Sequence, residues 1–217
     1  MSERLTDELG GLPGPLPEGE TIVWQGRPET GRLLAGAFHA RAVAFYFLLL
    51  AGVGLAMGRL EGVALTLGAG ALCLGVLALI ARASARSSVY TLTDRRLVLR
   101  VGVALPMHFN LPLKQIAAAD LRMGTGGSGD IALRLAGKGR IAWALLWPHV
   151  RPWRTRHPEP MLRAVPDAER IARLLHGCCA ALVDIEVAEA EPAIVAGASV
   201  APVRRPVRVA RRVEATA

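Results

Sequence analysis

Two long uncharged stretches dominate the hydropathy pattern of this chain. Residues 42–58 (AVAFYFLLLAGVGLAMG) and residues 62–81 (GVALTLGAGALCLGVLALIA) contain no charged side chain, and between them Arg59 and Glu61 are the only charges. A helix needs about 17 to 25 apolar residues to span the hydrocarbon core of a bilayer. Neither stretch keeps the polar stripe that a helix of a small soluble domain shows. The pattern therefore predicts a transmembrane hairpin over residues 42–81 rather than two buried core helices.

Arginines on the outer flanks give this hairpin an orientation. They precede it at Arg27, Arg32 and Arg41, and they follow it at Arg82, Arg86, Arg95, Arg96 and Arg100. The two charges of the hinge have opposite signs and nearly cancel. Because short cytoplasmic segments carry the excess of Lys and Arg, we expect a multi-pass protein with both termini in the cytoplasm.

Small residues recur at four-residue spacing in both stretches. Gly54 and Gly58 form one pair, and Ala71 and Gly75 form the other. Such spacing lets helix backbones approach closely in lipid. We expect these residues to pack the two helices of the hairpin on each other. The alternative is packing against a second copy, as a homodimer, or against another membrane protein.

Short alternating runs replace the long apolar stretches after residue 82, and they predict β-strands. With one run that precedes the hairpin, the expected strands cover residues 21–24, 88–92, 97–103, 108–113, 116–123, 131–135 and 141–147. Residues 93–96 make the turn of a β-hairpin, and Pro112 places its run at a sheet edge. So many strands at short spacing predict an antiparallel sheet, rolled or sandwiched.

A C-terminal helix is expected after the strands, because Asp167 is a suitable cap and an apolar stripe follows it. The stripe consists of Ile171, Leu174, Leu175, Cys178 and Leu182. From residue 186 an Ala-, Val-, Pro- and Arg-rich composition predicts a disordered basic tail. The expected fold class is an α+β membrane protein. Its parts are an N-terminal segment (1–41), the hairpin (42–81), a cytoplasmic domain (82–185) and the tail (186–217).

One segment of the predicted domain has an unusual composition. Residues 147–154 (WPHVRPWR) hold two tryptophans, two arginines and a histidine, with two prolines that keep the backbone extended. Trp and Arg are strongly enriched at binding hot spots. The segment is either a partner-binding surface or a connecting loop whose tryptophans cover the open end of the sheet. The candidate partner-binding residues are Trp147, His149, Arg151, Trp153 and Arg154, with Lys114 as a second choice.

The net charge of +8 permits binding to nucleic acid or to a membrane surface. Only two of the 26 basic residues are Lys, as a GC-rich genome would give, so arginine content alone indicates no phosphate site. The arginines of the predicted tail are not accompanied by a folded motif that could contact nucleic-acid bases. We therefore expect membrane lipids as the anionic partner and no nucleic acid.

The chain shows no pattern typical of an enzyme, a metal site or a resident cofactor. Cys73, Cys178 and Cys179 have neither disulfide nor zinc spacing. Residues 124–129 (GTGGSG) match G-x-G-x-x-G, but a strand pattern follows where a nucleotide site needs a helix, so a hairpin loop is expected. His39, at the membrane boundary, is interpreted as an interfacial polar residue rather than a ligand of a pigment magnesium.

The order of these features resembles a known family. The segment from Tyr90 to Arg96 (YTLTDRR), after an apolar hairpin, is similar to bacterial pleckstrin-homology-like membrane domains. Within that group, further blocks resemble the PuhB family of photosynthetic-complex assembly proteins of purple bacteria. These blocks are residues 102–107, 110–116, 119–122, 129–133 and 146–153. The resemblance covers residues 17 to 183, and the tail has no counterpart in it.

The resemblance implies a pleckstrin-homology-like antiparallel β-barrel, capped by the C-terminal helix, in the bacterial inner (intracytoplasmic) membrane. It implies an assembly factor, not an enzyme, that binds reaction-centre and core light-harvesting subunits in and at the membrane. A transient bacteriochlorophyll contact is left open, without support from the residues. The alternative is a membrane-anchored lipid- or ligand-binding module unrelated to photosynthesis.

Overall fold

A computed structural model describes residues 10–103, 105–136, 143–152, 158–195 and 208–212. In these ranges five helices, eight strands and two short 3₁₀ turns follow one another. They are β1 (Ile22–Gly26), α1 (Thr30–Gly36), α2 (Ala40–Ala56), α3 (Leu60–Ser87), β2 (Val89–Thr93), β3 (Arg96–Val101), β4 (Met107–Pro112), η1 (Leu113–Gln115), β5 (Ile116–Met123), η2 (Thr125–Gly127), β6 (Gly129–Leu135), α4 (Trp143–Leu146), β7 (Met161–Val165), α5 (Ala168–Val195) and β8 (Arg208–Arg212).

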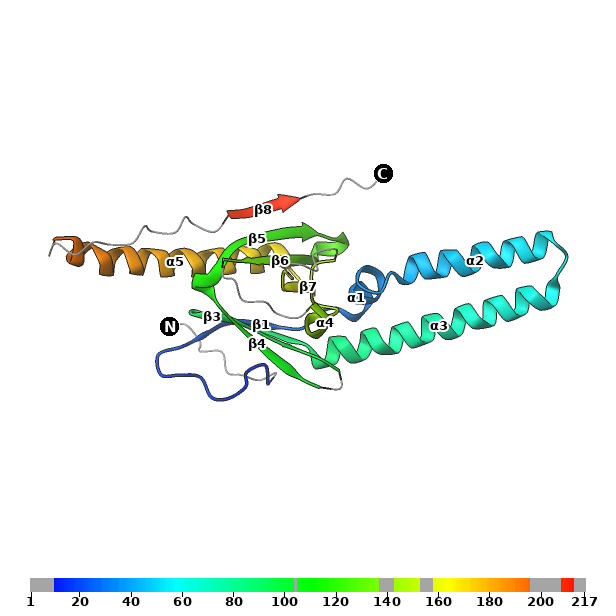
Figure 1. Cartoon of the computed structure of the whole chain (residues 1–217), viewed down its shortest axis with the longest axis horizontal. Helices are drawn as coiled ribbons and strands as arrows, with labels where there is room; N and C mark the ends of the chain where they lie inside the picture. The colour runs from blue at the N-terminus through cyan, green and yellow to red at the C-terminus, as the bar shows by residue number, and fades with distance from the viewer. Residues whose placement is uncertain (1–9, 104, 137–142, 153–157, 196–207, 213–217) are drawn as a thin grey trace.

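The molecule is elongated, with a β domain at its centre (Figure 1). Helices α2 and α3 lie side by side and project from one end of the domain. Helix α5 points to the opposite end. The domain therefore has one end at which apolar helices leave it and another end far from those helices.

Helix α3 is long and apolar enough to cross a membrane, with a mean hydropathy of 2.4 over its most apolar part. Helix α2 passes the same test only together with α1, across a bend of 57°. Large side chains of both helices are exposed, as expected for helices that have an apolar surrounding. The structure thus supports one candidate span, and the second span of the expected hairpin stays a prediction.

The contact between α2 and α3 uses one of the predicted small residues and one that was not predicted. Gly54 does face α3, because a Cβ there would lie 3.2 Å from Val63 Cγ2. Gly70, which the sequence analysis missed, is the tighter contact, where a Cβ would lie 2.9 Å from Phe47.

The other three predicted packing residues need correction. Gly58 has a φ of +70° and ends α2, so its role is a change of chain direction. Ala71 is exposed, and a Cβ at Gly75 would meet nothing within 4 Å. These two residues lie away from α2, because α3 turns a different face toward its partner helix.

The strands form two four-stranded sheets, in the orders β1-β2-β3-β4 and β7-β6-β5-β8. Neighbours are antiparallel, except that β8 pairs with β5 in parallel. Strand β4 is an edge strand, as Pro112 predicts. No ladder joins the two sheets within the described residues, so the expected closed β-barrel is wrong. The chain passes from one sheet to the other through η1 instead of continuing a single rolled sheet.

Residues 141–147 were expected to form a strand, but residues 143–146 form the short helix α4. A continuous apolar run lacks a period that separates strand from helix, and its Ala and Leu residues favour helix. Strand β7 was not predicted. The C-terminal part also differs, because α5 continues through the Ala- and Glu-rich residues to Val195 and β8 pairs with β5. The expected disordered tail from residue 186 is therefore wrong for these described parts.

The predicted turn at residues 93–96 is present and is held by its own polar residues. Thr93 Oγ1 accepts from the backbone N–H of Arg96 at 3.0 Å. The buried carboxylate of Glu20 accepts from Arg96 Nε at 2.7 Å and from Thr93 Oγ1 at 2.7 Å. Asp94 Oδ1 accepts from the backbone N–H of Thr21 at 3.1 Å. The motif that carries the family resemblance thus fixes the segment before β1 to the β2–β3 turn.

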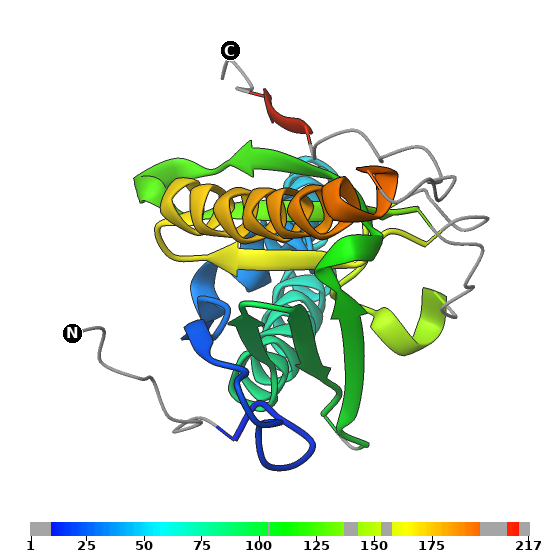
Figure 2. The ribbon, with the colours of Figure 1, turned by 90° about the vertical axis from the view of Figure 1, so that its left-hand side faces the viewer.

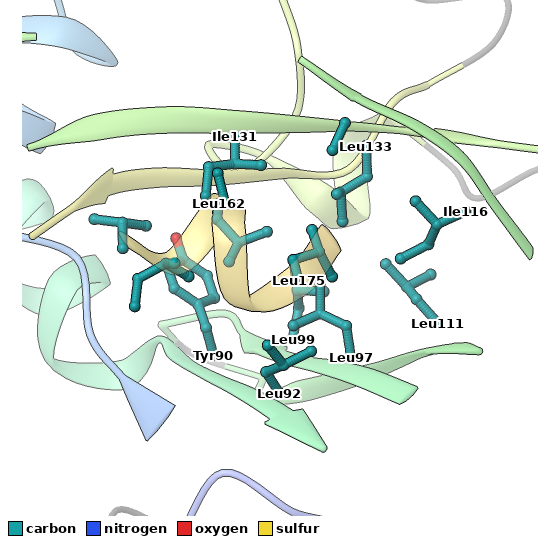
Figure 3. Close-up of a cluster of buried hydrophobic side chains, with 14 of the residues drawn as sticks. Tyr90, Leu92, Leu97, Leu99, Leu111, Ile116, Ile131, Leu133, Leu162 and Leu175 are labelled. Atoms are coloured by element: carbon teal, nitrogen blue, oxygen red, sulfur yellow. The ribbon is translucent and has the colours of Figure 1, made fainter. Parts of the chain in front are cut away.

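The hydrophobic core lies between the two sheets and against α5 (Figures 2 and 3). Leu92, Leu97 and Leu99 enter it from the first sheet, and Ile131 and Leu133 enter from the second. Leu175 of α5 closes it, which confirms that the apolar stripe of the predicted C-terminal helix covers a sheet. All these side chains are almost fully buried.

Helix packing can be tested with two glycines of α3. We expect Gly70→Leu to lower the stability of the α2–α3 pair by about 1–3 kcal/mol, because the new side chain overpacks against Phe47. The matched control, Gly75→Leu, adds the same side chain where nothing lies within 4 Å. The thermal unfolding midpoint of each purified variant in mild detergent measures the difference. Equal midpoints would contradict this helix contact.

Candidate functional site

The candidate segment lies where α3 meets the β domain. It follows α4 and runs from Trp147 to Pro152, and it pairs with residues 159–161, the last of which begins β7. The Met161 backbone N–H donates to the His149 carbonyl at 3.0 Å, and the Arg151 N–H donates to the Glu159 carbonyl at 3.0 Å. Val150 and Pro160 form an isolated antiparallel bridge. The segment is therefore an ordered extension of the second sheet.

His149 lies at the centre of a buried polar cluster. Its side chain is completely buried, and its Nδ1 lies 2.6 Å from the hydroxyl of Tyr90 in β2. Its Nε2 lies 2.9 Å from Ser88 Oγ and 3.4 Å from Ser84 Oγ, at the end of α3. A neutral imidazole has one donor and one acceptor nitrogen, and a hydroxyl can fill either role. The three hydroxyl groups thus satisfy both ring nitrogens.

The cluster continues to the second sheet. The backbone N–H of Arg163 in β7 donates to the Tyr90 hydroxyl at 3.2 Å. Arg163 Nη2 donates to the Val150 carbonyl at 3.1 Å. One imidazole and its partners therefore connect the end of α3, the first sheet and the second sheet.

Burial determines the protonation of this cluster. Desolvation, with a smaller repulsion from Arg163, lowers the pKa of His149 from 6.5 to about 3. Desolvation also raises the pKa of Tyr90 far above its usual value. A ring with so low a pKa is a poor general base near neutral pH, and its Nδ1 meets a phenol rather than a carboxylate. The Ser88–His149 contact is thus suited to holding structure rather than to activating a nucleophile.

Trp147 lies beside the cluster but remains partly exposed, at 46%. Its ring makes an edge-to-face contact with Phe38, with a centroid distance of 5.4 Å. It also borders an open, mostly apolar hollow of about 490 Å³. The lining residues are Leu79, Ile80, Ala83 and Ser84 of α3, Gly102 and Val103 after β3, and Trp147 with Pro148.

Arg151 takes part in an ion-pair cluster on the second sheet. Its Nη1 donates to Asp120 Oδ2 at 2.7 Å and to Glu159 Oε2 at 2.8 Å. The hydrogen bond to Asp120 is the largest of the effects that raise the pKa of Arg151. Arg134 also pairs with Asp120, at 3.4 Å. These contacts give Arg151 a structural role, although about a third of its side chain remains exposed.

The structure separates the predicted partner-binding residues. Trp147 is available at the surface, whereas His149 is in the interior and cannot contact a partner in this conformation. His149 was predicted to bind a partner. Its hydrogen bonds to the hydroxyls of Ser88 and Tyr90, which are distant in the sequence, explain why it is buried instead. Lys114 is exposed in η1, at the end of β4 away from Trp147. Trp153 and Arg154 lie outside the described residues.

Sequence reasoning missed the partners of this segment: Ser84, Ser88, Tyr90 and Phe38. One signal was present, because Ser84 and Ser88 are four residues apart at the polar end of an otherwise apolar helix. Within the described part of the chain, no group of three or more His, Cys, Asp or Glu side chains is placed to hold a metal ion. His39 is exposed at the start of α2, with Nδ1 3.3 Å from the Ala37 carbonyl.

Comparisons with known proteins identify the family to which this chain is similar. A family model described as bacterial PH domain matches residues 43–177, which include α2 and α3 as well as most of the β domain. A protein of Rhodobacter capsulatus, described as an uncharacterized 23.7 kDa protein in the puhA 5′ region, is 38% identical over 175 residues. The match covers 76% of this chain and 82% of that protein.

Among solved structures, the hSac2 domain from the human phosphoinositide phosphatase Sac2 is similar over 58% of this chain and 63% of that chain. Its sequence identity is 8% and the TM-score is 0.30, which is too low to relate the two folds.

The buried imidazole predicts a specific pH dependence of stability. Between pH 6.5 and about 3 the unfolded chain binds a proton at His149 that the folded chain does not bind, so stability falls as the pH falls through this window. From pH 7 to pH 5 this residue alone should cost about 2 kcal/mol. The thermal unfolding midpoint of the detergent-purified chain, followed over this range, measures the effect.

His149→Gln is the matched control, because it keeps a polar side chain without a titrating ring. We expect this variant to be less stable at pH 7, since the Tyr90 and serine hydroxyls lose well-placed partners. Its midpoint should also change less between pH 7 and pH 5. An identical pH dependence in both proteins would show that His149 is not the buried titrating group.

Proposed function

This chain belongs to the bacterial PH domain family, and we propose that within this family it is an assembly factor for the photosynthetic reaction centre and core light-harvesting complex, as its resemblance to the PuhB family implies. It acts by binding subunits in and at the membrane. The helix pair lies in the bacterial inner (intracytoplasmic) membrane as two spans, and the β domain and both termini lie on the cytoplasmic side. This role needs no catalytic group and no resident cofactor.

The link to photosynthesis is supported by a relative. The Rhodobacter capsulatus protein, which is 38% identical, is described by its position 5′ to puhA, in a photosynthesis gene region. The match to this relative covers 76% of the chain and 82% of that protein, so the similarity extends well beyond one local motif.

The observation that carries the binding role is the exposed outer face of α3. Leu65, Leu72, Val76 and Leu79 form one stripe along this helix, and each is between 47% and 77% exposed. The stripe faces away from the α2 contact at Gly70. An apolar helix in lipid can offer such a face to the transmembrane helix of a client subunit. Ala71 and Gly75, which lie away from α2, permit close approach there.

Trp147 extends this surface to the β domain. It lies beside Leu79 and Ile80 at the hollow and is held in place by the buried cluster around its neighbour His149. A rigid, partly exposed tryptophan is suited to anchor a contact, since little side-chain entropy is lost on binding. A client helix on α3 would thus meet Trp147 where that client leaves the membrane.

A second candidate function is a membrane-anchored lipid- or ligand-binding module unrelated to photosynthesis. The hollow at Trp147 favours it, because its volume of about 490 Å³ is in the range of small-molecule sites. It is open and mostly apolar, with Ser84 as the polar group of its lining. This alternative requires no client protein.

A pulldown of the tagged chain from photosynthetically growing cells, in mild detergent, tests the assembly role. We expect reaction-centre or core-antenna subunits in the eluate, identified by absorption spectra and mass spectrometry. Trp147→Ala should reduce their recovery several-fold, because loss of an interfacial tryptophan costs about 2 kcal/mol or more. Trp147→Ala with Trp153→Ala extends the test to the remainder of the segment.

Arg173→Ala, at an exposed position of α5, is the control and should leave recovery unchanged. A tagged wild-type chain that recovers no photosynthetic subunit, while those complexes stay intact in the extract, would contradict the assembly role. Saturable binding of a radiolabelled lipid by that same preparation would then favour the second candidate.

A further inference from the structure

The loop between β3 and β4 lies beside the end of α3 that joins the β domain (Figure 1). Gly102 and Val103 line the same hollow as Leu79, Ile80 and Ala83 of α3. Gly102 has a φ of +115°, and a Cβ there would collide with the Leu105 carbonyl, so this tight turn requires glycine. The turn that carries Val103 therefore lies against the end of α3 that joins the β domain.

The tip of this hairpin is apolar and exposed. Val103 is 54% exposed and Leu105 is 79% exposed, and Met107 at the start of β4 is also exposed. A loop between two strands of a water-exposed domain normally carries polar residues, because exposed large apolar side chains gather only where something covers them. Trp147, across the hollow, adds an exposed aromatic ring to the same end of the domain.

The position of the hairpin along α3 sets its depth relative to a bilayer. From Leu60 to Ile80 the helix covers about 30 Å, which is the thickness of the hydrocarbon core. Arg82 and Arg86, both exposed, are the first charges on α3 after Glu61. The hollow that contains Val103 therefore lies at the boundary between hydrocarbon and headgroups, where tryptophan is also enriched.

We propose that the β3–β4 hairpin tip and Trp147 insert into the cytoplasmic-side interface of the bilayer and hold the β domain against the membrane. The surface consists of Val103, Leu105, Met107 and Trp147, and its partner is a lipid surface that contains anionic headgroups. The proposal rests on the membrane placement of α3 given above, but not on any client subunit.

Continuity with α3 favours lipid over a protein as the partner of this surface. The stripe of Leu72, Val76 and Leu79 leads along the helix into the hollow, at successive steps of four and three residues. Where no client subunit covers the stripe, the lipid around it reaches the hairpin tip without crossing a polar barrier. Arg82 and Arg86, one and two turns beyond Leu79, suit anionic headgroups at about 1 kcal/mol each.

Site-directed fluorescence in vesicles tests this proposal. Leu105→Cys is introduced into the full chain with Cys73, Cys178 and Cys179 changed to alanine, and it is labelled with an environment-sensitive fluorophore. The protein is reconstituted in phosphatidylcholine vesicles with phosphatidylglycerol, without and with lipids that carry a nitroxide near the headgroup. We expect a blue shift of the emission and loss of intensity with the nitroxide lipid.

Two other labelled positions serve as controls for the result at Leu105→Cys. Lys114→Cys, at the far end of β4, should show neither the shift nor the quenching. Leu72→Cys, on the exposed stripe of α3, should be quenched by a nitroxide placed deep in the acyl chain. Quenching at Leu72→Cys but not at Leu105→Cys would overturn the hairpin insertion and leave the membrane anchor intact. No quenching at any position would overturn the membrane placement on which both proposals rest.

A second measurement uses the unmodified chain, in case the cysteine-free background fails to fold. The wild-type protein in the same vesicles, doped with a photoactivatable lipid, is irradiated and digested. We expect lipid adducts on the tryptic peptides that contain Leu105 and Trp147, and none on the tryptic peptide of residues 115–122 in β5. Adducts confined to peptides of α2 and α3 would overturn the proposal, as would protection of the hairpin only after a client subunit is added.

Discussion

A single buried imidazole connects the apolar helix to both sheets of the β domain. His149 meets two serines at the end of α3 and a tyrosine of the first sheet, and that tyrosine receives the backbone N–H of Arg163 in the second sheet. Each of these polar groups would be costly to bury alone, and each is satisfied by another member of the cluster. The arrangement therefore holds only while α3, β2 and β7 keep their relative positions, and it places Trp147 next to the hollow.

In this domain the apolar contacts contribute stability, and the polar contacts determine the orientation of the elements. Leucines between the sheets supply most of the apolar burial, but a leucine core tolerates small rotations of one sheet on the other. The hydrogen bonds that join His149 to Tyr90 and Tyr90 to Arg163 have strict geometry and fix the orientation of one sheet on the other. Those of Glu20 with Thr93 and Arg96 fix the segment before β1 to the first sheet.

Local patterns were enough to predict much of this fold. The range of β5 agrees residue for residue with the prediction, the β2–β3 hairpin turns at the expected residues, and the start of α5 follows Asp167. Each of these elements has a clear period or a specific turn or cap residue. Residues 143–146 had neither, since a continuous apolar run fits a strand and a short helix equally well.

The interior position of His149 had no local signal at all. Its partners are 59 to 65 residues away in the sequence, so its burial depends on how α3 and β2 return to the same place. The separation of the sheets was equally hidden, because strand patterns do not tell whether neighbouring strands continue one sheet or begin another. The candidate segment was thus found by composition, while its division into a surface tryptophan and a buried histidine required the structure.

Only Ser88 separates the last residue of α3 from the first residue of β2. This junction has no flexible linker, and the buried cluster beside it prevents rotation about the remaining bonds. A helix that spans a bilayer adjusts to a thinner or thicker membrane by changing its tilt. In this protein the first sheet would turn through the same angle as the helix, because the two are joined without a linker. The angle between the β domain and the bilayer surface would then depend on the thickness of the surrounding bilayer.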